Sequence, residues 1–223
     1  MKNWAPDLKQ ALKENKGFIL LIILMSVCRS AIADWYTVPT GSMLPTIEIG
    51  DRVTVNKMAY DLRVPFTSIS LAKVGEPERG DIVVFESDAA DERMIKRVVG
   101  LPGDTVEMRN EILLINGQPL EYVVQSDDVT EMYAKESLGS DAHIIRLAKQ
   151  NGSGLDNFSP VVVPDGEYLV LGDNRRNSAD SRVYGFVPRS ELRGKAHHVA
   201  FSLDLDNNYI PRTERFLSNL YEL

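Results

Sequence analysis

The chain has 223 residues, which is enough for one substantial domain or for one domain with an insertion. Its formal net charge of −7 argues against a nucleic-acid partner, because contact with phosphates needs a basic face. Cys28 is the only cysteine, so an intrachain disulfide is excluded, and an exported domain would have to be stable without one.

A basic leader and an apolar run open the chain. Residues 1–16 contain four lysines, and residues 18–28 are apolar apart from Ser26. We predict that residues 17–34 form one transmembrane anchor with residues 1–16 in the cytoplasm, because lysines on a short leading segment hold it on that side. As a helix, residues 17–33 would span roughly 26 Å, slightly less than a hydrocarbon core of ~30 Å.

The same segment has two further interpretations. The basic start, the short apolar centre and the Ala-Ile-Ala at 31–33 also fit a cleavable signal peptide, and the apolar run could instead be a buried core helix. Arg29 favours the anchor, because a signal peptide stays apolar up to its cleavage site, whereas an arginine near the end of an anchor can reach the interface. Trp35 and Tyr36 also suit a membrane interface.

Beyond residue 36 the sequence predicts short strands separated by turns. Residues 52–55 alternate polar and apolar side chains like a half-buried strand, whereas residues 82–85 are wholly apolar like a buried one. Short strands at regular spacing are typical of a coiled antiparallel sheet or barrel-like core. The expected strands are 36–38, 52–55, 82–85, 93–99, a hairpin of 105–108 and 112–115, then 161–163, 168–171, 184–187 and 198–203.

Residues 121–160 differ in composition from the segments around them. They are polar and rich in Ser, Asp, Asn and Gly, with one helical candidate near 141–150. We expect an inserted flap or small subdomain here. The tail, residues 211–223, is amphipathic and is expected to pack on the domain.

Ser42 stands between Gly41 and a nearby proline, close behind the apolar run, in the segment Pro-Thr-Gly-Ser-Met-Leu-Pro-Thr of residues 39–46. A serine hydroxyl is a weak nucleophile and needs a neighbouring base. The chain has three histidines, none of them in a catalytic-looking context, so a Ser-His-Asp triad is not expected. Taken alone, the segment also fits an ordinary turn between strands.

Lys96 is a candidate for that base. In a strand, alternation puts Met94, Lys96 and Val98 on one face and directs Arg97 the opposite way, towards solvent or into a salt bridge. On a core face, desolvation would lower the pKa of the lysine, and a neutral amine is the kind of base that a serine needs. Taken alone, the residue is better interpreted as a solvated strand lysine.

A polar loop at residues 172–182 is the third feature. Its charged side chains can form an ion-pair network, and Ser178 could orient a lysine amine. A metal site is not expected, because no histidine lies nearby in the sequence to complete one. The adjacent His197 and His198 are not at ligand spacing and are expected on a strand surface. The charged residues of the loop are Asp173, Arg175, Arg176, Asp180 and Arg182.

Four segments in this order, residues 39–46, 80–85, 95–104 and 172–182, together resemble the bacterial type I signal peptidases, or leader peptidases. The resemblance covers residues 29–203. It implies a membrane-anchored Ser/Lys endopeptidase that removes signal peptides from exported preproteins, cutting after small residues of the Ala-x-Ala type. It also implies a protein of the bacterial inner membrane, with a catalytic domain on the periplasmic side and no cofactor. Many Gram-negative members carry two membrane segments, whereas the one apolar segment of this chain predicts a single pass.

The resemblance assigns roles to individual residues. Ser42 would be the nucleophile and Lys96 the general base. Thr40 would help the oxyanion site, and Ser178 would orient the lysine. The supporting charged network would comprise Arg97, Asp173, Asp180 and Arg182. An extended preprotein would bind along Thr37, Val38, Pro39, Ile47, Met94 and Ile95, which would form shallow pockets for small residues.

The implied fold is mainly β, a coiled antiparallel catalytic domain with a small inserted β subdomain after one transmembrane helix. The expected boundaries are 1–16 for the cytoplasmic terminus, 17–34 for the anchor, 35–104 with 165–223 for the catalytic domain, and 105–164 for the insertion. Three alternatives stay open: a dedicated peptidase for one secretion or conjugation substrate, a self-cleaving repressor-type peptidase, and an anchored binding protein without activity. The apolar leader and the acidic charge argue against the repressor type.

Overall fold

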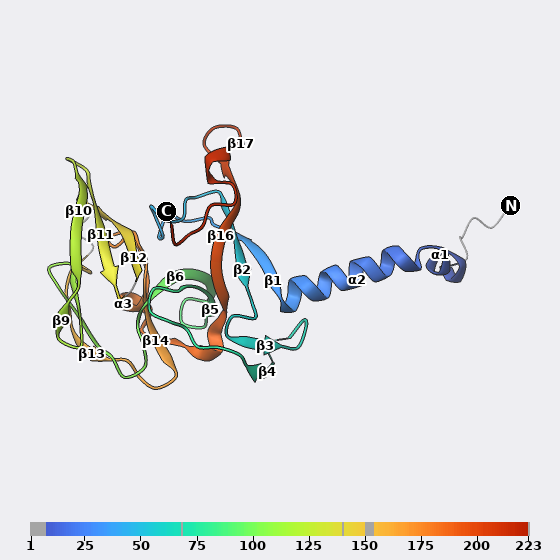
Figure 1. Cartoon of the computed structure of the whole chain (residues 1–223), viewed down its shortest axis with the longest axis horizontal. Coiled ribbons are helices and arrows are strands. Elements are labelled where there is room, and N and C mark those ends of the chain that lie inside the picture. The colour runs from blue at the N-terminus through green and yellow to red at the C-terminus, as the bar shows by residue number, and fades with distance from the viewer. Residues whose placement is uncertain (1–7, 68, 140, 150–153, 223) are drawn as a thin grey trace.

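The structure is a computed structural model that describes residues 8–67, 69–139, 141–149 and 154–222. Two helices, α1 (Leu8–Glu14) and α2 (Lys16–Ala31), extend away from a body made of β-sheets (Figure 1). The fold is therefore mainly antiparallel β, as the strand pattern predicts.

The apolar leader forms α2, which ends at Ala31. Strand β1 (Ala33–Thr37) begins two residues after the end of α2 and pairs with β2 (Asp51–Asn56). Residues 33–34 of the predicted anchor therefore belong to a strand, and the anchor over residues 17–34 stays a prediction. Lys57 Nζ donates to the carbonyls of Arg29 and Ser30 at 3.0 and 3.3 Å, which satisfies the C-terminus of the helix. Over the described ranges, no helix combines the length and the apolar character needed to cross a membrane.

The main sheet has eight strands, all antiparallel to their neighbours. Its order is β1-β2-β16-β5-β6-β14-β15, and β17 pairs with β16. Strand β5 is apolar and buried from Ile82 to Phe85, and β2 alternates in burial, as predicted for both. The remaining bounds are β6 (Glu92–Gly100), β14 (Glu167–Leu171), β15 (Val187–Pro188), β16 (Leu192–Asp204) and β17 (Ile210–Pro211).

Residues 105–164, called the insertion below, form two further sheets. The predicted hairpin is β7 (Thr105–Arg109) with β8 (Ile112–Ile115), within a sheet of order β13-β7-β8-β9. The second sheet has the order β10-β11-β12. The strands of the insertion not yet bounded are β9 (Gln118–Pro119), β10 (Glu121–Asp127), β11 (Glu131–Leu138), β12 (Asp141–Ala148) and β13 (Phe158–Val162). Outside the insertion, β3 (Asp61–Arg63) and β4 (Ser70–Lys73) form a separate two-stranded sheet.

Two local predictions are wrong. Residues 141–148 are strand β12 and not a helix, because His143, Ile145 and Leu147 are buried at every second position and the segment pairs with β11 along its whole length. The expected strand 184–187 is instead the short helix α3 (Ser181–Tyr184) followed by β15, since the Asp180 carboxylate accepts a hydrogen bond from the backbone N–H of Arg182 and caps α3.

One apolar core cluster joins the insertion to the main sheet. It packs Val99 and Leu169 of the main sheet against Val106 and Leu113 of the insertion, all fully or nearly fully buried. The C-terminal tail packs on the domain as predicted. Leu220 is buried, and its N–H donates to the His197 carbonyl at 2.9 Å, after the 3-10 turn η2 (Thr213–Arg215).

Candidate active site

Ser42 and Lys96 lie side by side although 54 positions separate them in the chain. Lys96 Nζ is 2.8 Å from Ser42 Oγ, and it also donates to the carbonyl of Ile95 at 3.0 Å. Lys96 is only 4% exposed and Ser42 only 8%. The arrangement places an amine in direct hydrogen-bond contact with a hydroxyl, which is the geometry of a nucleophile and its base.

The loop between β1 and β2 positions Ser42. Met43 and Ile47 anchor it in the core, where both are fully buried. A second loop holds its backbone, because the Asn174 N–H donates to the Ser42 carbonyl at 3.1 Å and Asn174 Nδ2 donates to the Gly41 carbonyl at 2.8 Å. Ser42 is therefore fixed from both sides.

Strand β6 positions Lys96 on a buried face, with Met94 and Val98, as the alternation predicts. Burial lowers the pKa of Lys96 to about 8, and the charges of Asp180, Glu92 and Asp173 act in the opposite direction. At pH 7 about one tenth of the amine is then neutral, far more than for a solvated lysine.

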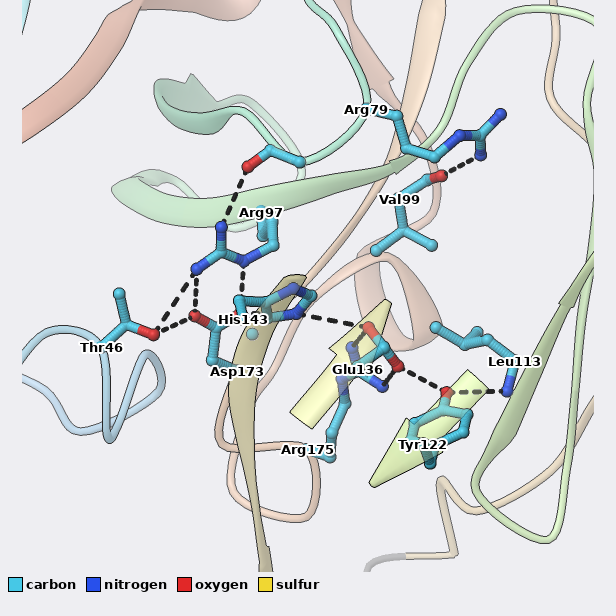
Figure 2. Close-up of polar contacts among 12 residues, drawn as sticks. Thr46, Arg79, Arg97, Val99, Leu113, Tyr122, Glu136, His143, Asp173 and Arg175 are labelled. Atoms are coloured by element: carbon cyan, nitrogen blue, oxygen red, sulfur yellow. Dashed lines mark hydrogen bonds and ion pairs between the residues drawn. The ribbon is translucent and has the colours of Figure 1, made fainter. Parts of the chain in front are cut away.

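Arg97 points away from Lys96 but is buried instead of facing solvent. Its Nε and Nη2 donate to the Asp173 carboxylate at 2.9 and 2.7 Å, and Nη1 donates to the Gly80 carbonyl at 3.0 Å (Figure 2). Thr46 Oγ1 donates to the same carboxylate at 2.6 Å. These contacts tie the strand of the lysine to the loop of the serine.

The four predicted network residues form two pairs. Asp180 accepts from Arg182 Nε at 2.8 Å and Nη2 at 2.7 Å, and it also accepts from the Gly172 N–H at 3.0 Å. Arg97 with Asp173 is the other pair. The loop 172–182 is thus held by carboxylates at both of its ends.

Ser178 lies beside the pair with its hydroxyl buried. A Cβ on Gly172 would come within 2.2 Å of Ser178 Oγ and 2.4 Å of the Ser42 carbonyl oxygen, so only glycine fits between the two serines. Ser178 Oγ makes no hydrogen bond to any residue in the described ranges. Its orienting role therefore stays a prediction, as does the oxyanion role of Thr40, whose exposed side chain lines the cleft.

A cleft of about 260 Å³ is lined by Lys96 and Thr40, whereas Ser42 is not in its lining. Ile47 lies in the core and does not line it. In the described part of the chain β1 is an edge strand, and residues 92–96 of β6 pair only with β5, so two free strand edges flank the cleft. Five of the six predicted substrate-binding residues are in its lining: Thr37, Val38, Pro39, Met94 and Ile95.

Two buried residues next to the site, Glu136 and His143, were missed by the sequence reasoning. Arg175 pairs with Glu136 of β11, and His143 of β12 lies beside them. The signal for His143 was its place in a period-two apolar pattern, which the helical interpretation concealed. Among the described residues, no group of His, Cys, Asp and Glu side chains is placed to hold a metal ion.

Comparison with known proteins gives a consistent result. Residues 12–201 match the family model for signal peptidase, peptidase S26. Signal peptidase I of Pseudomonas aeruginosa is 36% identical over 204 residues, covering 84% of this chain and 71% of the relative. Signal peptidase I S of Bacillus subtilis is 36% identical over 196 residues, covering 86% and 90%.

Among solved structures, the crystal structure of a signal peptidase I from Enterococcus faecalis V583 is 32% identical. It covers 55% of this chain and 98% of that chain, with a TM-score of 0.36. The family model and the relatives each span most of the sequence, including both members of the buried pair. The chain therefore belongs to the signal peptidase family, peptidase S26.

Proposed function

We propose that the protein is a membrane-anchored serine endopeptidase that removes N-terminal signal peptides from exported preproteins with Ser42 as nucleophile and Lys96 as base. Signal-peptide removal is the activity of its family. The single observation that carries the mechanism is the 2.8 Å contact between Lys96 Nζ and Ser42 Oγ in a buried setting.

The first step is proton transfer. Neutral Lys96 takes the proton of Ser42, and Oγ attacks the scissile carbonyl carbon. The C–N bond then breaks, the amine of the mature protein leaves with the proton from Lys96, and the signal peptide stays on Ser42 as an ester. Lys96 next takes a proton from water, whose oxygen attacks the ester carbonyl carbon. The bond between that carbon and Ser42 Oγ breaks, Lys96 returns the proton to Oγ, and the signal peptide leaves as an acid.

The oxyanion formed in both attacks needs donors. Within the described residues the Ser42 N–H donates to no acceptor, so it is available for the oxyanion. Thr40 lies two residues before it and lines the cleft with Lys96, which supports a second donor from its hydroxyl.

The substrate would bind as an extended strand. The free edges of β1 and of residues 92–96 flank the cleft, so a peptide between them can form backbone hydrogen bonds on both sides. Val38 and Met94 are apolar parts of the lining, and a cleft of about 260 Å³ shared by several side chains suits small residues near the cut.

The bilayer would hold the enzyme beside its substrate. Helix α2 exposes large apolar side chains, for example Phe18 at 64%. The β3–β4 hairpin exposes three more, Phe66, Ile69 and Leu71, and its Phe66 N–H donates to Ser30 Oγ at the end of α2 at 2.6 Å. We infer that α2 enters the inner membrane with the hairpin against the lipid and the β-sheets on the periplasmic side.

The test is cleavage of a purified preprotein by the wild type, Ser42→Ala and Lys96→Arg. Both variants should lose cleavage, because alanine has no nucleophile and an arginine stays protonated near neutral pH. Retained cleavage by Lys96→Arg would remove the lysine from the mechanism. Rescue of cells depleted of their own signal peptidase would distinguish a general enzyme from one dedicated to a single secretion or conjugation substrate.

A further inference from the structure

Two buried ion pairs lie near each other beside the site, and the second of them joins the 172–182 loop to the insertion (Figure 2). Arg97 pairs with Asp173, and Arg175, two residues further along the same loop, binds both carboxylate oxygens of Glu136 from β11. All four side chains are at most 3% exposed. Buried charges are strongly unfavourable unless they are paired, and here two cations face two anions.

His143 of β12 lies between these pairs. Its Nε2 is 3.3 Å from Glu136 Oε1 and 3.7 Å from Asp173 Oδ1. Burial, with a smaller contribution from Arg97, lowers the pKa of His143, so its ring is neutral near pH 7. The tautomer with the proton on Nε2 turns its N–H towards the Glu136 carboxylate, a close polar contact without hydrogen-bond geometry, whereas the other tautomer would set a lone pair against it.

The insertion also contacts the loop that holds the nucleophile. Two backbone hydrogen bonds, of 2.9 and 3.0 Å, join Arg146 of β12 to residues 173–175. The middle residue of that loop, Asn174, donates to the carbonyls of Ser42 and Gly41 at 3.1 and 2.8 Å. The path from β12 to the serine therefore contains a single intervening loop.

We propose that Glu136 and His143 are positioning residues for the peptidase reaction, which hold the 173–175 loop so that Ser42 stays in contact with Lys96. The inference rests on the proposed roles of that pair. Loss of the Glu136 charge would leave Arg175 buried and unpaired in the loop. The loop would then move, and a displacement of about 1 Å at a reacting group can lower the rate by about 100-fold.

The experiment compares four variants of the full chain with the wild type. Glu136→Gln removes the charge at nearly constant shape, and His143→Met removes the Nε2 donor. His143→Gln keeps an N–H near the position of Nε2 and serves as the conservative rescue. Asp61→Asn is the matched control, because Asp61 is also a buried carboxylate, paired with Arg189 at 2.9 Å. Its polar partners among the described residues, Arg63, Ser70 and Arg189, all lie outside the serine loop.

The readouts are kcat and KM for one preprotein, the rate at which a serine-directed acylating probe labels Ser42, and the thermal unfolding midpoint. For Glu136→Gln and His143→Met we expect kcat and the labelling rate to fall by roughly 10- to 100-fold, with KM within about twofold. His143→Gln should stay within about threefold of the wild-type kcat. Asp61→Asn should lose stability but keep its kcat.

Several results would overturn the positioning role. One is a wild-type kcat, or a change in KM alone, in Glu136→Gln and His143→Met. Another is a fall in the kcat of Asp61→Asn as large as theirs. The last is that Glu136→Gln and His143→Met both fail to fold while Asp61→Asn folds. Full cleavage by Ser42→Ala would instead overturn the proposed function. An inactive Ser42→Ala beside a fully active Glu136→Gln would overturn the positioning role alone.

Discussion

The pH dependence of cleavage tests the lysine directly. If Lys96 must be neutral to accept the Ser42 proton, kcat/KM should follow the neutral fraction of the free enzyme. Burial sets the pKa of Lys96 at about 8, against an ordinary value of 10.5. The rate should therefore rise about tenfold from pH 7 to pH 9 and level off above about pH 9.

The magnitude follows from the same pKa. A lysine of pKa 10.5 would be about 0.03% neutral at pH 7, whereas one of pKa about 8 is about 10% neutral. At pH 7 burial of Lys96 thus raises the neutral fraction of the amine by roughly two to three orders of magnitude, equivalent to about 3 kcal/mol.

The assay is the initial rate of cleavage of one purified preprotein, at concentrations well below KM, between pH 6 and pH 10.5. The control is the same substrate checked for constant solubility and structure across that range. A profile that is flat between pH 7 and pH 9, or one whose midpoint lies near 10.5, would contradict the role assigned to the amine.

Three further predictions follow from the same contacts. Lys96→Met should raise the free energy of unfolding by about 3 kcal/mol at pH 7, because it removes a buried charge. The gain should vanish between about pH 8 and 10.5, where the wild-type lysine is neutral in the folded state but still protonated in the unfolded state. A gain that does not change with pH in denaturant titrations would contradict this. Gly172→Ala should lower kcat by about 100-fold, since its Cβ would collide with Ser178 and the Ser42 carbonyl, and an active variant would show that the loop can shift. Asp173→Asn should cost about 3–5 kcal/mol in chemical unfolding by leaving a buried arginine unpaired, whereas a loss under 1 kcal/mol would indicate that water reaches it.

Local patterns were enough to predict the main strands and to single out Ser42 and Lys96 as candidates, whereas their joint role rested on the resemblance to signal peptidases. Alternation along residues 93–99 placed Lys96 on a buried face, and the Gly-Ser segment near Pro39 and Pro45 marked the serine loop. Such patterns depend on neighbours in sequence, so they survive without knowledge of the tertiary fold.

Features that depend on distant contacts were not predictable in this way. Arg97 was expected near solvent or in a salt bridge, and its burial follows from Asp173, which is 76 positions away. Glu136 is a polar residue in a strand, and nothing in its sequence surroundings indicates that Arg175 will cover it. Ile47 packs into the core although it follows the serine closely, because the loop turns inward there.

Strand β6 directs two neighbouring basic side chains, Lys96 and Arg97, to opposite faces. On one side Lys96 has been stripped of water, has no carboxylate within ion-pair distance among the described residues, and can give up its charge. On the other side, one residue further along, the pairing with Asp173 raises the pKa of Arg97 and secures its charge at any physiological pH. A single peptide unit thereby separates an amine that can lose its proton from a guanidinium that keeps its charge, and the two remain coupled through the charge of Asp173.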